Sequence, residues 1–126
     1  MRRLPQSFDD KKPIYIQVRE RLEDMIVKGQ LEEGEQAPST TQLSKFYKIN
    51  HITVGKGVNQ LVDEGILFKK RGIGMFVSEG AKEKLLDNRR QTFVAEYIRP
   101  LIDEAEKLDL TQEEILRMLK QEKRSE

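Results

Sequence analysis

The sequence contains no cysteine and no tryptophan, a single histidine, and only 6% aromatic residues. The absence of cysteine excludes disulfide bonds, thiolate nucleophiles and cysteine-ligated zinc, and a lone His51 excludes a cluster of several histidines around a metal. The sequence also lacks a phosphate-binding P-loop and paired carboxylates in an apolar setting. We therefore expect no enzymatic activity and no bound metal or cofactor.

Long hydrophobic runs are missing too. No apolar stretch approaches the roughly 20 residues that a membrane span needs, and no signal-peptide stretch follows the N-terminal residues 1–5. We therefore expect a cytoplasmic protein that does not contact a membrane. A length of 126 residues allows one ordinary domain with a small appendage.

Charge is almost balanced overall, at +1, but unevenly distributed. Residues 1–78 carry 13 basic and 10 acidic side chains, whereas residues 79–126 carry 10 basic and 12 acidic ones. The stretch 45–71 holds six basic residues against two acidic ones. Such a basic face can follow a phosphate backbone, although charge alone fits a solvated surface equally well.

Three helices are predicted in the first half of the chain. Apolar residues at spacings of three and four predict a helix from Pro13 to Lys28. Ser39 and Gln42 form a capping-box pattern that begins a short helix, on which we expect Leu43 and Phe46 to face inward. Asn50 can cap a third helix that ends at Gly65.

The third helix divides into two faces. Its buried stripe is predicted to consist of Val54, Val58, Leu61 and Val62, which leaves the side chains of the other faces for a partner. After Gly65, two short apolar runs around a glycine-containing turn predict a basic hairpin. Two helices joined by a short turn and followed by a hairpin indicate a winged helix-turn-helix.

The second half, residues 79–126, is predicted to be helical. Pro100 lies inside its apolar pattern and predicts a kink or a break near residues 97–99. Thr111 and Glu114 form a further capping box before a last helix. The predicted fold class is therefore mainly α with a small β-hairpin. We expect a winged helix-turn-helix DNA-binding domain over residues 1–78 and a helical segment for dimerisation or effector response over residues 79–126.

The apolar stripe of this second half exceeds what a small helical tail needs to cover itself, which favours a homodimer interface. Packing of the same stripe onto the first helix is the alternative. The predicted interface residues are Phe93, Val94, Tyr97, Ile98, Leu101 and Ile102.

Five landmarks in order resemble the GntR family of bacterial transcription regulators. They are the string from Pro13 to Gln17, the stretch from Gly29 through Gly34 to Ser39, the pair Thr53 and Val54, Leu61 with Glu64 and Gly65, and the pattern Gly72-x-Gly74-x-Phe76-Val77. The short C-terminal part resembles the YtrA subgroup. The resemblance implies a transcriptional regulator, and a repressor because repression is common in the family. It also implies binding of double-stranded DNA by a homodimer on a pseudo-palindromic operator.

The resemblance also implies which residues meet DNA. The start of the third helix would read base edges in the major groove, and the hairpin would contact backbone or minor groove. The first turn of the short helix offers N–H donors to a phosphate, with capping alone as the alternative role of Ser39. The expected DNA-binding residues are Ser39, Thr40, Thr41, Asn50, His51, Ile52, Thr53, Lys56, Lys69, Lys70, Arg71, Gly72 and Gly74.

The sequence departs from the family pattern at several positions. Thr41 stands where the family usually has an arginine, Gly55 where a polar or basic residue is common, and Ile73 and Met75 alter the wing. Gly55 and Gly57 also lower the helix propensity of the third helix, so we expect a compensating role for them. That role is a close approach of a partner to the helix backbone or, at Gly57, tight packing of a neighbouring helix. A winged-helix module for protein interaction or RNA binding remains the alternative function, and a small-molecule effector remains unidentified.

Overall fold

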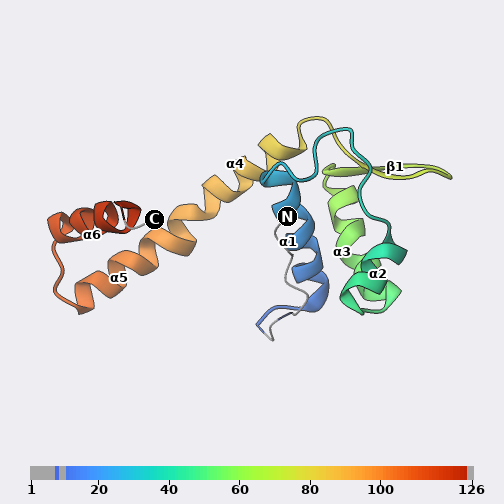
Figure 1. Cartoon of the computed structure of the whole chain (residues 1–126). Helices are drawn as coiled ribbons and strands as arrows, with labels where there is room; N and C mark the ends of the chain where they lie inside the picture. The colour runs from blue at the N-terminus through green and yellow to red at the C-terminus, as the bar shows by residue number, and fades with distance from the viewer. Residues whose placement is uncertain (1–7, 9–10, 125–126) are drawn as a thin grey trace. The chain divides into compact units, whose positions relative to one another are not determined.

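The computed structural model describes Phe8 and residues 11–124, so residues 1–5, where no signal peptide is expected, lie outside it. The chain divides into two compact units, Met1–Asp87 and Asn88–Glu126 (Figure 1). The predicted division into functional domains at residue 78 stays a prediction. Within the described part of the chain, no helix combines the length and the apolar character that crossing a membrane requires.

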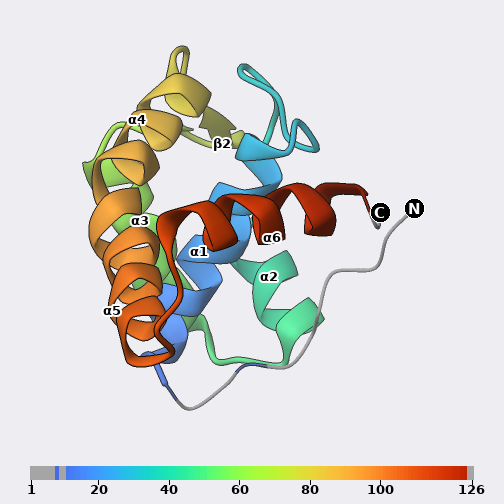
Figure 2. The same cartoon turned by 90° about the vertical axis from the view of Figure 1, so that its left-hand side faces the viewer.

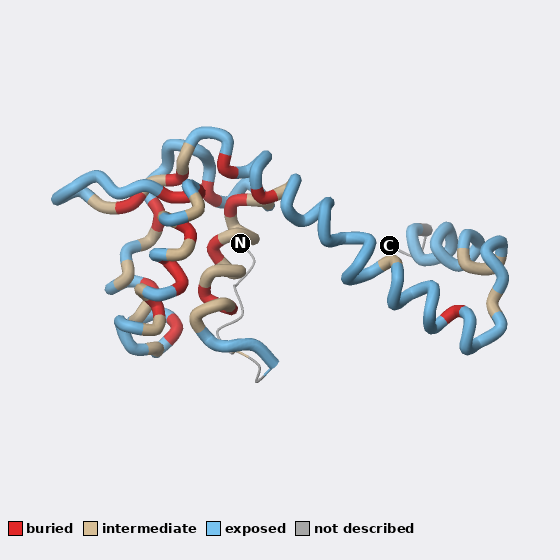
Figure 3. The backbone as a smooth tube through the Cα atoms, turned by 180° about the vertical axis from the view of Figure 1, so that it is seen from behind, coloured by how far each residue is buried: buried red, intermediate tan, exposed pale blue. Residues whose placement is uncertain are grey.

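The first unit contains α1 (Ile14–Val27), α2 (Thr40–Tyr47) and α3 (His51–Asp63), then β1 (Leu67–Lys70), β2 (Gly74–Val77) and the start of α4 (Ala81–Phe93). This order confirms the predicted mainly helical fold with a small hairpin. The core lies where α1, α2, α3 and the hairpin meet (Figure 3). Its largest fully buried side chains are Val18, Leu22, Ile26, Val54, Val58, Leu61, Ile66, Leu67 and Val77.

Local capping begins α2 and α3 as predicted. The Ser39 hydroxyl accepts a hydrogen bond from the Gln42 backbone N–H at 3.0 Å, and the Gln42 side chain accepts one from the Ser39 N–H at 2.8 Å. The Asn50 side chain accepts from the Thr53 N–H at 2.9 Å. These bonds satisfy backbone donors that have no partner within a helix.

Phe46 does not face inward, so that prediction is wrong. Its side chain is 44% exposed, and Tyr47 is buried instead. Leu43 and Tyr47 are four residues apart and share one face of α2, whereas Phe46 lies at the edge of that face. The Phe46 ring packs edge-on against Tyr47, with ring centroids 4.9 Å apart.

The hairpin has an additional neighbour that the sequence pattern did not predict. β1 and β2 are antiparallel, with Phe68 opposite Phe76. Residues 35–37 lie along the other edge of β2: the Ala37 N–H donates to the Met75 carbonyl at 2.8 Å, and the Val77 N–H donates to the Glu35 carbonyl at 3.0 Å. Both edges of β2 are therefore hydrogen-bonded in this region.

Helices α1 and α3 approach closely at Gly57, where a Cβ atom would lie 2.4 Å from the Tyr15 carbonyl oxygen. Arg19 of α1 connects the same helices, because its Nη2 donates to Glu64 at 2.6 Å and its Nη1 donates to Gln60 at 3.1 Å. Burial acts to lower the pKa of Arg19, but hydrogen bonds and charge from Glu64 and Glu23 outweigh it and raise the pKa. Tight helix packing, one of the predicted reasons for Gly57, is thus observed.

The start of α4 is held by contacts within the first unit. The Glu33 carboxylate accepts hydrogen bonds from the N–H groups of Gly80 at 3.0 Å and Lys82 at 3.4 Å. The Lys84 ammonium donates to the carbonyl of Glu64, which caps the C-terminus of α3. A carboxylate at a helix N-terminus also interacts favourably with the helix dipole.

The second unit contains the end of α4, a π-helical turn η1 (Val94–Ile98), α5 (Arg99–Lys107) and α6 (Gln112–Arg124). The irregularity expected near Pro100 is this π turn, in which the Arg99 N–H donates to the Val94 carbonyl. η1 continues into α5 without a break (Figure 2). The predicted capping box before α6 is present, since Thr111 and Glu114 exchange hydrogen bonds of 2.9 and 3.1 Å.

Gly57→Ala is expected to lower the free energy of unfolding by about 1–3 kcal/mol, because the new methyl group would collide with the backbone of α1. Gly55→Ala is the matched control: a methyl group there has no other protein atom within 4 Å, and we expect about 0.5–1 kcal/mol of stabilisation. Urea unfolding followed by circular dichroism measures both. Equal stability of the two variants would contradict the close approach at Gly57.

The Glu114 carboxylate should titrate below its ordinary range, because hydrogen bonds from the Thr111 backbone and side chain lower its pKa. A lowered pKa means that this contribution to stability is present above the ordinary value of 4.5 and is lost as the pH falls through the folded-state pKa. Carboxyl-carbon NMR measures the titration directly. Thr111→Val should move the Glu114 pKa upwards, and an unchanged value would contradict the assignment.

Candidate nucleic-acid interface

The first turn of α2 presents hydroxyl groups beside backbone N–H donors. Thr41 is exposed and Thr40 is half-buried, while Ser39 is exposed at the cap position. The Ser39 capping bond uses an acceptor lone pair of the hydroxyl and not its hydrogen. This turn can therefore offer donors and a positive dipole end to a phosphate while Ser39 serves the helix.

Helix α3 has one buried and one exposed face, as its sequence pattern predicts. Val54, Gly57, Val58 and Leu61 are buried, and Val62 is only half-buried. The exposed ridge, as we call the opposite face, comprises the exposed residues Ile52, Lys56 and Asn59 together with the half-buried Gly55, spaced at three and four residues. His51 is exposed at the start of the helix, next to Asn50, and Thr53 is half-buried.

Lys56 has a partner in α1 that the sequence analysis missed. Its ammonium nitrogen lies 4.0 Å from the centroid of the Tyr15 ring. A cation over an aromatic ring is stabilised by about 0.5–1 kcal/mol at exposed sites. Lys56 is therefore held towards α1. To bind a DNA phosphate, its ammonium group would have to leave the Tyr15 ring. The spacing of 41 residues between Tyr15 and Lys56 gave no local signal for it.

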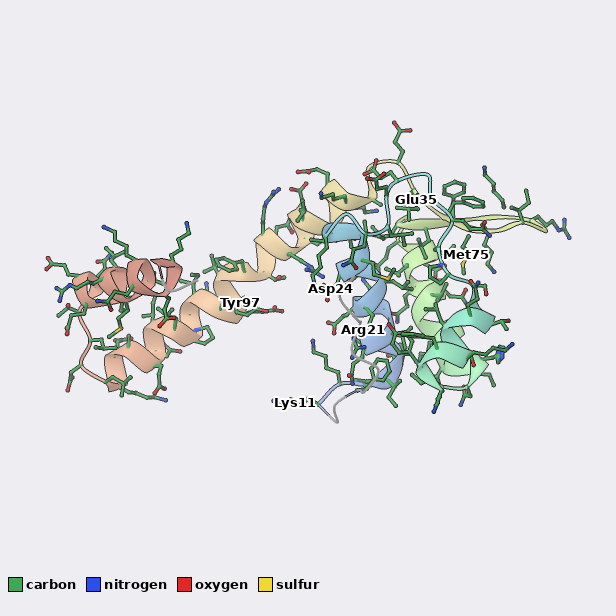
Figure 4. All side chains as sticks on the ribbon, in the orientation of Figure 1. Lys11, Arg21, Asp24, Glu35, Met75 and Tyr97 are labelled. Atoms are coloured by element: carbon green, nitrogen blue, oxygen red, sulfur yellow. The ribbon has the colours of Figure 1, made fainter. Side chains whose placement is uncertain are left out.

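The wing comprises residues 69–74, and all its predicted cations are exposed. The Lys70 ammonium lies 4.6 Å from the Phe76 centroid, and Phe68 stacks on Phe76 with a centroid distance of 5.9 Å. The side chains of the hairpin end project away from the rest of the first unit (Figure 4). The cross-strand pair of Phe68 and Phe76 thus stabilises the hairpin that carries the exposed cations.

The turn of the wing requires its glycines. Gly72 has a φ of +77° and Gly74 a φ of +145°, values that side chains other than hydrogen rarely allow. The Gln36 side chain lies against Gly74 and donates a hydrogen bond to the Ile73 carbonyl at 3.0 Å. Gln36 is a positioning residue that the sequence analysis missed, because its partner lies 37 residues away.

These three groups of side chains belong to one compact unit. α2 packs on α3, and β1 continues from the C-terminal end of α3 into the hairpin. In Figure 1 the hairpin projects on the side of α3 where α2 lies. Donors on α2, a mixed polar and apolar ridge on α3 and cations on the wing are arranged as a winged helix-turn-helix requires for meeting a duplex.

The six predicted dimer residues lie on the second unit. Phe93, Val94, Tyr97, Leu101 and Ile102 are exposed, and Ile98 is half-buried. The rings of Phe93 and Tyr97 lie 5.7 Å apart, and Figure 4 labels Tyr97 on the π turn. The second unit thus carries an exposed apolar set around η1 and the start of α5.

The model for bacterial regulatory proteins of the gntR family matches residues 14–77. The HTH-type transcriptional repressor YtrA of Bacillus subtilis is 33% identical over 93 residues, which cover 74% of this chain and 71% of YtrA. A GntR-family transcriptional regulator from Bacteroides thetaiotaomicron has a similar structure, with a TM-score of 0.72, 30% identity, and coverage of 89% of this chain and 97% of that one.

The DNA-binding domain of AraR, solved in complex with operator ORR3, matches with a TM-score of 0.53 and 26% identity. That match covers 60% of this chain and 92% of the AraR domain. The resemblance seen in the five sequence landmarks is thereby confirmed, both for the helix-turn-helix segment and for the short YtrA-type architecture. This chain belongs to the GntR family of bacterial transcription regulators.

Proposed function

We propose that this regulator binds a specific operator through α2, α3 and the wing, and that it represses transcription by occupying promoter DNA. The observation that carries the proposal is the exposed ridge of α3 beside a basic wing, on a fold that AraR uses in complex with its operator. Repression is supported by the name of the relative YtrA, a transcriptional repressor.

The proposed interactions with DNA divide by chemistry. Ser39, Thr40 and Thr41 hold a phosphate at the start of α2, with backbone N–H groups supplying the donors. His51, Ile52 and Thr53 meet base edges where α3 enters the major groove, and Asn50 fixes that end of the helix by capping it. The cations of the wing neutralise phosphates, and Gly72 and Gly74 give its turn the required backbone conformation.

We further propose that the second unit forms a homodimer, so that two copies of α3 meet two half-sites of a pseudo-palindrome. One helix-turn-helix touches few bases, and a two-fold dimer doubles their number at half-sites about one helical turn apart. The support is the exposed apolar set around η1 and α5. Burying it between two chains would remove these side chains from water.

The full-length protein is expected to prefer DNA from upstream of its own gene by at least about a thousandfold over a scrambled duplex of equal length. Fluorescence anisotropy across a salt series measures both affinities, and both should fall as salt rises. Equal affinity for the two duplexes would contradict recognition of an operator at that locus. No binding at low salt would favour the protein-interaction or RNA-binding alternative. In that case, the absence of the family's usual arginine at position 41 would mark the loss of a DNA-binding surface.

The same assay tests the wing. Neutralising Lys69, Lys70 and Arg71 as glutamines should reduce the slope of log K against log salt by about 0.9 for each phosphate that is no longer neutralised. The matched control neutralises Lys107, Lys120 and Lys123, which are exposed on the second unit. If both triple variants change the slope equally, the wing has no special role in binding.

Phe93→Glu/Leu101→Glu should reduce the mass in multi-angle light scattering from that of a dimer to the 14.7 kDa of one chain. Charges placed in the apolar set oppose its burial between two chains, and both side chains are exposed in the single chain. Leu116→Glu is the control, since Leu116 is an exposed leucine on α6 outside the set. A double variant that stays dimeric would exclude this interface.

A further inference from the structure

Ile52 is the most exposed of the large hydrophobic side chains within the described residues, at 84%. It is the second residue of α3, and it contributes nothing to the buried face of that helix. Single exposed hydrophobic residues are common on protein surfaces. The position of Ile52 on the exposed ridge and the residues beside it nevertheless point to a specific contact for its side chain.

The next positions on the ridge are unusually open. Gly55, three residues on, carries no side chain, and a methyl group there would have no other protein atom within 4 Å. Lys56, four residues on, has its ammonium over the Tyr15 ring. An apolar side chain therefore lies beside a ridge position that has no side chain, and the ammonium of the ridge residue Lys56 is held towards α1.

The major groove contains one apolar group on the edges of the bases, the C5 methyl group of thymine. The isoleucine side chain has no hydrogen-bond donor or acceptor, so it contributes binding free energy only when it is buried against such an apolar group. An open glycine next to it allows the helix to approach the bases closely. Base edges that carry only hydrogen-bonding groups would leave Ile52 against unsatisfied polar atoms.

We propose that Ile52 is a specificity-determining residue that selects thymine at one position of each half-site by packing against its C5 methyl group. The inference rests on the proposed function, because it needs α3 in the major groove. It adds the chemical identity of one base that the operator must contain and assigns a role to an apolar residue where hydrogen bonds would be expected.

Selection of the full-length protein on a random duplex pool supplies the bound sequence for the test. Each thymine is then replaced in turn by deoxyuridine, which removes only the methyl group, and Kd is measured by fluorescence anisotropy. We expect one position per half-site at which the replacement weakens binding about fourfold, the equivalent of about 0.8 kcal/mol for one buried carbon. Replacement in both half-sites should weaken it about 15-fold.

Ile52→Ala should bind the thymine and deoxyuridine duplexes equally at that position, and Ile52→Val should keep part of the difference. Leu116→Ala is the control, because Leu116 is also an exposed aliphatic residue, at 51%, but lies on α6 and is not among the proposed DNA-binding residues. It should leave the thymine preference unchanged. Thermal melting of the variants checks folding, which the exposure of both side chains predicts to be preserved.

The outcomes separate this inference from the proposed function. If selection enriches a sequence but no deoxyuridine replacement weakens binding, or if the weakening persists in Ile52→Ala, Ile52 does not read thymine and operator recognition still stands. If selection enriches no sequence, the proposed operator recognition fails, and the role of Ile52 fails with it.

Discussion

The packing of α1 on α3 positions everything else in the first unit. At Gly57 the two backbones approach until no side chain fits between them, and Arg19 closes the same interface with hydrogen bonds to Gln60 and Glu64. Helix α2 and strand β1 also pack on α3, and the face of α3 that these elements leave uncovered is open to solvent. Gly57 and Arg19 thus help to set the orientation of the exposed ridge without belonging to it.

The wing depends on a second, non-local constraint. A two-stranded hairpin is marginally stable by itself in water. Here residues 35–37 bond to the free edge of β2, and Gln36 reaches the turn to bond the Ile73 carbonyl. The loop between α1 and α2 therefore supports the wing, and it also supplies Glu33 to the start of α4. One irregular segment thus supports both the wing and the start of α4.

What the sequence predicted was local. The capping pairs Ser39 with Gln42 and Thr111 with Glu114 lie three residues apart, so their bonds follow from the pattern itself. The faces of α3 followed from its periodicity. Phe46 was assigned to the wrong face because an eight-residue helix has few positions from which to fix its rotation. The partners Tyr15 with Lys56 and Gln36 with Ile73 depend on the tertiary fold, which no spacing along the chain encodes.

The π turn before Pro100 affects which residues of the proposed dimer surface lie on one face of the helix. In a regular α-helix, a residue eight positions along is rotated by about 80° from the first. A π turn accommodates one extra residue, so Leu101 takes the angular place of the seventh residue after Phe93, within about 20° of it. Deleting a single residue from 94–98 would restore ordinary helical geometry with a phase suited to a heptad, whereas an insertion would rotate the two halves of the stripe out of line. Insertions among relatives should therefore be rarer in this stretch than in the loop before α6.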